Sequence, residues 1–136
     1  MTESGVVDRI EPQALPHSLA APRLARQYLT SRAAEWPAEL LDLVVLLANE
    51  LVTNAVVHGR GPVELSIGDD GRRIRIEISD GDPDPLPGDA GRPPNAQQSG
   101  RGLLVVDSLA DRWGCRLHRV PPGKTVWFEL QYEMSG

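Results

Sequence analysis

The chain has 136 residues, of which 40% are hydrophobic, and a formal net charge of −5. This length predicts one domain with room for a hydrophobic core, and the acidic balance argues against a protein that binds nucleic acid through a basic face. Cys115 is the single cysteine, so an internal disulfide and a cysteine-based zinc site are excluded, which is typical of a reducing cytosol.

The N-terminal segment carries few structural signals. Residues 1–5 lack the basic and apolar regions of a signal peptide, so we expect a cytoplasmic protein. We interpret residues 1–10 as an extension in which Val6–Ile10 forms a short strand, and residues 11–133 as a single domain.

A first helix is predicted after a proline-containing loop. Pro12 and Pro16 indicate the loop, and Ser18 can cap a helix that runs to about Glu35. The apolar side of this helix would consist of Leu19, Leu24, Tyr28 and Leu29.

A second, longer helix is predicted from Pro37 to Gly59. Proline suits the first helical position, and glycine suits the position just past the end. The segment is apolar nearly all round, so we expect the helix to be buried on most sides. It also contains Glu, Asp and two Asn residues, which argue against a membrane span.

Glu50 and Asn54 stand out on this helix. They are four residues apart, so they lie on the same face, among apolar neighbours. Burying an ionised carboxylate there without partners would cost several kcal/mol. Two interpretations stay open at this point: the pair faces a site that supplies partners, or it extends a polar strip at the wet edge of the helix. That strip would consist of Glu39, Asp42, Asn49 and Thr53.

A β-hairpin is predicted over residues 62–80. Apolar and polar residues alternate on both sides of an Asp69-Asp70-Gly71 turn, which indicates two strands with one buried and one wet face. The second strand ends in Ser79-Asp80-Gly81. Asp80 is therefore expected at the position where the buried face of this strand ends.

The character of the chain changes over residues 82–99, which contain five prolines and almost nothing apolar. A structureless stretch of this length inside a compact domain is usually a functional lid or disordered. A linker between two domains is the alternative, but too little chain follows to form a second core. We therefore interpret the stretch as a lid.

A third helix is predicted to begin at Gly100-Arg101-Gly102-Leu103. A glycine-rich helix start exposes backbone N–H groups at the positive end of the helix dipole, which is a phosphate site in principle. Two strands follow, from Trp113 to Val120 and from Lys124 to Tyr132. The core-facing residues of the last strand would be Val126, Phe128 and Leu130, while Cys115 and His118 are interpreted as strand residues without chemistry.

Gly123-Lys124-Thr125 looks like the end of a P-loop, but the rest of that motif is missing. The motif needs a glycine where position 118 is His, and it needs a helix afterwards where this chain is strand-like. We therefore reject a P-loop.

The pieces together resemble a known family. The segments ELVTNAVVHG, SDGDP, GRGLLVVDSLADRWG and GKTVWFEL occur in this order. They resemble the GHKL ATPase superfamily and, within it, the small anti-sigma factor serine kinases of bacterial partner-switching systems, in the actinobacterial branch. The resemblance covers roughly residues 10–131. It implies a Bergerat-type α/β (α+β) two-layer sandwich, with helices on one face of a mixed, mostly antiparallel sheet.

The resemblance also implies cofactors and site residues. ATP and Mg²⁺ would be bound, with the amide oxygen of Asn54 on the metal, since an oxygen ligand suits that hard ion. Glu50 would act as general base on the attacking hydroxyl. Asp80, followed by Gly81, would accept from the exocyclic amine of adenine, and the hydroxyl of Thr125 would lie near the adenine. Residues 100–103 would close on the phosphates: Gly100, Arg101, Gly102 and Leu103.

One motif departs from the superfamily pattern. Glycines usually stand at the second and fourth positions after the aspartate, where this chain has Asp82 and Asp84. Both would add negative charge near a triphosphate, and Pro83 would stiffen the hinge of the lid.

Three functions are compatible with the resemblance. The leading hypothesis is an ATP-dependent serine kinase that phosphorylates a STAS-type anti-anti-sigma partner and thereby regulates a sigma factor, without direct nucleic-acid or membrane contact; homodimers are usual in such families. The alternative is a regulatory switch, ATP-binding or nucleotide-independent, that lacks kinase activity. A detached histidine kinase domain ranks low, because about 36 residues precede the long helix and His17 lies in a Pro-flanked loop.

Overall fold

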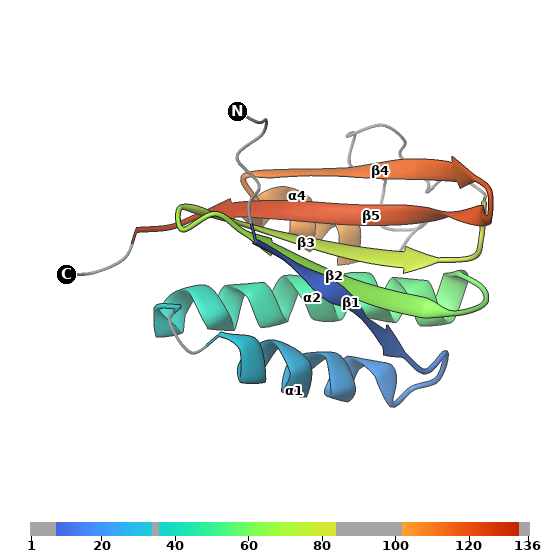
Figure 1. Ribbon diagram of the computed structural model, residues 1–136, viewed down its shortest axis with the longest axis horizontal. Helices are drawn as coiled ribbons and strands as arrows, with labels where there is room; N and C mark the ends of the chain where they lie inside the picture. The colour runs from blue at the N-terminus through green and yellow to red at the C-terminus, as the bar shows by residue number, and fades with distance from the viewer. Residues whose placement is uncertain (1–7, 34–35, 84–101, 134–136) are drawn as a thin grey trace.

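The computed structural model describes residues 8–33, 36–83 and 102–133 (Figure 1). Asp84, Gly100, Arg101 and most of the predicted lid lie outside the described residues. In chain order, the elements are β1 (Asp8–Leu15), α1 (Ala21–Arg32), α2 (Ala38–His58), β2 (Val63–Asp69), β3 (Arg73–Asp80), α4 (Gly102–Leu109), β4 (Arg112–Arg119) and β5 (Pro122–Gln131).

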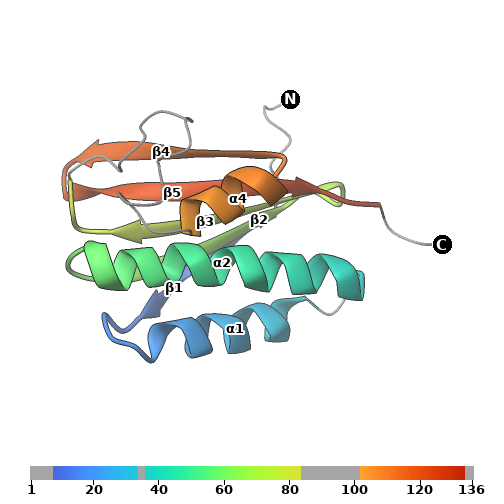
Figure 2. The ribbon, with the colours of Figure 1, turned by 180° about the vertical axis from the view of Figure 1, so that it is seen from behind.

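The predicted two-layer architecture is confirmed. The five strands form one sheet in the order β1-β2-β3-β5-β4, and every pairing between described strands is antiparallel. Helices α1, α2 and α4 cover one face of this sheet, as the two opposite views show (Figures 1 and 2). The other face of the sheet carries no described helix.

Helix α2 is the centre of the core. By length and composition alone it could cross a membrane, contrary to the expectation from its polar residues. It is instead in contact with α1, α4, β2 and β3, so we assign it to the core of the domain. Its buried residues recur at helical spacing and are Leu40, Val44, Leu47, Ala48, Leu51, Val52 and Ala55.

The predicted hairpin is confirmed, and so is the core-facing side of the last strand. Strands β2 and β3 join through a turn in which Gly71 adopts a φ of 87°, a conformation that favours glycine. Along β5, Val126, Phe128 and Leu130 are buried against the helices. The period-two pattern was therefore a sufficient guide to these strands.

The first strand differs from the prediction. A short strand at Val6–Ile10 followed by a proline loop was expected, but β1 runs from Asp8 to Leu15 and includes Pro12. The register of β1 on β2 shifts between Ile10 and Gln13, and β1 is an edge strand. An edge strand with an irregularity tolerates a residue that lacks an N–H group, which is why the proline does not end it.

Helix α1 is shorter than predicted, and its predicted apolar side is only partly right: Leu29 is buried and Tyr28 packs against the core. It begins at Ala21, and its buried residues are Ala21, Ala25 and Leu29, four apart. Leu19 precedes the helix and is 86% exposed, and Leu24 is also exposed. Two of the three buried residues of α1 are alanines, so a pattern based on large apolar residues misses part of the buried face.

Candidate functional site

The candidate site lies where the end of α2 meets the ends of β3 and β5. Asp80 is the last residue of β3, and it is only 6% exposed although it carries a carboxyl group. Gly59, just past α2, clears the space beside it: a Cβ at position 59 would stand 2.6 Å from Cγ of Asp80 and 2.5 Å from the carbonyl oxygen of Ala55. A side chain at position 59 would therefore force the helix end away from this carboxylate.

A small cavity beside this carboxylate joins the three elements, and we call it the Asp80 cavity. Its volume is about 20 Å³, which is room for roughly one water molecule. The residues that line it are Leu51, Asn54, Ala55, His58, Ile78, Asp80, Lys124 and Val126. The structure thus brings together Asn54 and Asp80, two residues that are 26 positions apart in the sequence.

Lys124 is a member of this site that the sequence reasoning did not select. Its side chain is buried, with Nζ 3.2 Å from Oδ1 of Asp80 and 3.4 Å from the carbonyl oxygen of Asp82. The same ammonium lies 3.9 Å from a carboxylate oxygen of Asp82. The backbone N–H of Asp82 also donates to Oδ1 of Asp80, at 2.7 Å. Asp82 thus lies against this lysine, rather than standing as an unopposed negative charge.

A sequence signal for Lys124 did exist. Residues 126, 128 and 130 of β5 face the helices, and alternation along a strand puts position 124 on the same face. The register agrees, because Lys124 pairs with Asp80 across β3 and β5.

The hydroxyl of Thr125 belongs to a small network of side chains, and the role predicted for it near the adenine stays a prediction. Its Oγ1 lies 2.9 Å from Oγ of Ser79 and 2.8 Å from Nε2 of His118. Alternation puts these groups on the face of the sheet opposite the helices, while Lys124 takes the place beside Asp80. His118, expected to be a plain strand residue, is held in the same small network.

Glu50 and Asn54 lie on α2 in half-buried positions. Within the described residues, neither side chain forms a hydrogen bond or an ion pair. Asn54 lines the Asp80 cavity, whereas Glu50, one turn earlier, does not. The described part of the chain also contains no cluster of three or more His, Cys, Asp or Glu side chains able to hold a metal. A metal here would therefore depend on ligands from the nucleotide as well as from Asn54.

The start of α4 is described only from Gly102 onward. Leu103 is fully buried in the core, so its side chain anchors the helix instead of pointing to a ligand. Gly81 is held by a hydrogen bond from its N–H to the carbonyl oxygen of Arg60, at 2.6 Å. This bond fixes the chain as it leaves β3.

The two ends of the site fit ATP and Mg²⁺ differently. The unpaired, half-exposed amide of Asn54 suits one coordination position of a hard cation whose other ligands are phosphate oxygens and water. At the Asp80 end, the described residues leave too little room for a nucleotide base. Pockets that bury a small ligand usually have volumes of about 300–1,000 Å³, and the ammonium of Lys124 already occupies the carboxylate.

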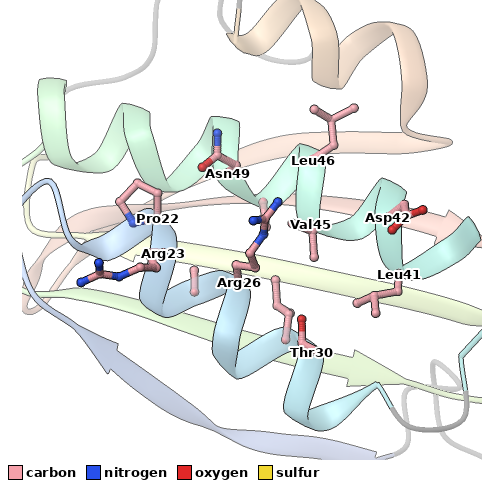
Figure 3. A pocket seen from close by; sticks show the side chains of 12 residues that line it. Pro22, Arg23, Arg26, Thr30, Leu41, Asp42, Val45, Leu46 and Asn49 are labelled. Atoms are coloured by element: carbon pink, nitrogen blue, oxygen red, sulfur yellow. The ribbon is translucent and has the colours of Figure 1, made fainter. Parts of the chain in front are cut away.

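A separate groove of about 660 Å³ lies between α1 and α2 (Figure 3). Arg23 and Arg26 of α1 border it on one side, and Asp42, Leu46 and Asn49 of α2 border it on the other. It shares no lining residue with the Asp80 cavity. The groove therefore belongs to another surface of the molecule.

Comparison with known proteins gives one family. The family model of the histidine kinase-like ATPase domain matches residues 13–130, which include every described residue of the Asp80 cavity. No curated protein matches the chain.

Proposed function

Because the chain belongs to the histidine kinase-like ATPase domain family, we propose that it is a regulatory protein kinase. It would transfer the terminal phosphoryl group of ATP to a serine of a STAS-type anti-anti-sigma protein and so control a sigma factor. Membership of the family supports ATP binding and a regulatory role. The serine substrate and both partners rest on the sequence resemblance, as do a cytoplasmic location and a possible homodimer.

The observation that carries the proposal is the pair Glu50 and Asn54. Both side chains are unpaired within the described residues and lie on one face of α2, and Asn54 shares a cavity with Asp80. When bound, Mg²⁺ would neutralise phosphate charge, and the Asn54 amide oxygen would be its protein ligand. The carboxylate of Glu50 would accept the proton of the attacking serine hydroxyl. Both side chains are half-buried, so a ligand can still reach them.

The experiment is phosphoryl transfer from labelled ATP, with Mg²⁺, to each candidate STAS-type protein of the same genome. Glu50→Gln keeps the shape of the side chain but cannot accept a proton, so transfer should slow by at least about a hundredfold while the partner still binds. Asn54→Ala should weaken Mg²⁺-dependent nucleotide binding. The matched controls are Glu39→Gln and Asn49→Ala, because both residues are exposed on the same helix. Equal rates for Glu50→Gln and Glu39→Gln would make Glu50 a structural residue.

A second candidate is a regulatory switch without kinase activity. The contact between Lys124 and Asp80 favours this switch, because the ammonium binds the carboxylate that the adenine base of ATP would need. Under this reading the native protein binds its partners but transfers no phosphate to any of them. Partner binding that ATP does not alter would support the nucleotide-independent form of the switch.

A further inference from the structure

Lys124 is the only lysine of the chain, although the chain contains 13 arginines. Its ammonium is buried beside two carboxylates, those of Asp80 and Asp82. An ammonium group donates hydrogen bonds and accepts none. It therefore presents to Oδ1 of Asp80 the same kind of N–H donor that an exocyclic amine of a base would present.

The surroundings are arranged closely around this contact. Asp80 pairs directly with Lys124 across β3 and β5, and the lysine stem lines the cavity with Ile78 and Val126. At Gly123, just before the lysine, an added Cβ would collide with the backbone carbonyl oxygen of Asp80. The close pairing of β3 and β5 therefore places the ammonium beside the carboxylate, and the cavity between the described residues has little free volume.

We propose that Lys124 is an internal competitor for the nucleotide base, so that a base carrying an exocyclic amine reaches Asp80 only when the lysine leaves. The inference rests on the proposed nucleotide-binding function and adds the residue that sets its affinity. The form with Asp80 free is a minor fraction of the ligand-free protein, and the apparent dissociation constant rises in inverse proportion to that fraction. The native protein is consequently a weak ATP binder whose affinity can be raised by one substitution.

The test is calorimetric titration of Mg²⁺-ATP into the native protein, Lys124→Ala and Gln131→Ala. Lys124→Ala removes the competitor and opens the cavity, so its dissociation constant should fall by at least about tenfold. Gln131→Ala is the control: it changes an exposed residue at the other end of the same strand. Its affinity should equal that of the native protein.

Inosine triphosphate sharpens the test, because it has a carbonyl oxygen where ATP has the exocyclic amine. Asp80 cannot accept a hydrogen bond from that oxygen, so Lys124→Ala should gain far less affinity for it than for ATP. Equal gains for the two nucleotides would show that the substitution merely enlarges the cavity, which overturns the proposal. An unchanged or weaker ATP affinity in Lys124→Ala also overturns it, and native binding in that case would leave the proposed function intact.

A measurement on the native protein covers the case in which Lys124→Ala fails to fold. Lysine labelled with ¹⁵N gives one side-chain signal, since the chain has one lysine. The buried, ion-paired ammonium should give a slowly exchanging signal that is lost or strongly shifted when Mg²⁺-ATP is added to millimolar concentration. A signal that ATP leaves unchanged overturns the proposal, whereas phosphoryl transfer to a STAS-type protein tests the kinase activity separately.

Discussion

Strands β3 and β5 carry buried charges on both faces, and the two groups are built differently. On the helix-covered face, Asp80 faces the single ammonium of Lys124. On the other face, Glu77 and Glu129 are buried among several arginines, and we call this group the outer-face cluster. Its members are Arg73, Arg75, Glu77, Arg112, Arg116, Trp127 and Glu129.

The outer-face cluster contains more than one arginine for each buried glutamate, and some of these arginines are exposed to solvent. Arg75 donates to Glu77 at 2.8 Å and to Glu129 at 2.7 Å, and its guanidinium lies 3.9 Å from the ring centre of Trp127. Arg112 also approaches Glu129, at 3.4 Å, with a side chain that is 63% exposed. If one arginine is lost, the others still contact the two glutamates, so the cluster should tolerate single substitutions. Among the described residues, Lys124 supplies the one ion pair of Asp80, which is the arrangement that the proposed exchange of partners requires.

The largest predicted effect on stability is that of Lys124→Ala. Removing one partner of a buried ion pair leaves the other charge uncompensated, so the free energy of unfolding should fall by about 3 kcal/mol. Urea unfolding followed by circular dichroism measures this change. If Lys124→Ala loses no more unfolding free energy than Arg116→Ala, which removes an exposed arginine, the two faces of the sheet do not differ in this respect.

Arg75→Ala should have a smaller effect, although this arginine makes more contacts than the lysine does. The remaining arginines and water can still solvate Glu77 and Glu129, and the lost stacking on Trp127 is worth about 0.5–1 kcal/mol. We expect the free energy of unfolding to fall by about 1–2 kcal/mol in Arg75→Ala, and by less at high salt, because salt screens the ion pairs of the native protein. Unfolding curves at low and high salt test this. If Arg75→Ala loses as much unfolding free energy as Lys124→Ala and the loss does not depend on salt, the outer-face cluster is as shielded from solvent as the Asp80 cavity.

The same contrast explains what the sequence could predict. Alternating and helical periods come from local burial, so they placed the hairpin, α2 and the core side of β5. The sequence alone did not place Pro12 in a strand, because only the sheet order makes that strand an edge. The buried face of α1 includes two alanines, which a search for large apolar residues passes over. In the site, Asn54 and Asp80 line one cavity, and the roles predicted for them stay predictions. Lys124 was missing from the predicted site although alternation along β5 puts it on the helix-covered face.

The smallest predicted effect concerns Asp70, an exposed carboxylate in the turn between β2 and β3, which is the exposed limit of the comparison. The backbone N–H groups of Arg72 and Arg73 donate to its Oδ1 at 2.9 and 2.8 Å. These hydrogen bonds, that from Arg72 foremost, lower the pKa of Asp70 below its ordinary value of 3.8. The folded protein therefore favours the charged carboxylate more than the unfolded chain does.

A lowered pKa fixes the sign of the pH dependence. The contribution of Asp70 is fully present above the unfolded value and is lost as the pH falls through the lower folded value. Asp70→Asn keeps an acceptor oxygen but no charge, so between neutral pH and about pH 3 it should lose slightly less stability than the native protein does. Because the group is exposed, we expect a difference of about a few tenths of a kcal/mol. Gln131→Ala, an exposed substitution that removes no titratable group, is the control and should lose as much stability in acid as the native protein does. Identical acid responses of all three proteins would show that the hydrogen bonds of this turn do not favour the charged form of Asp70.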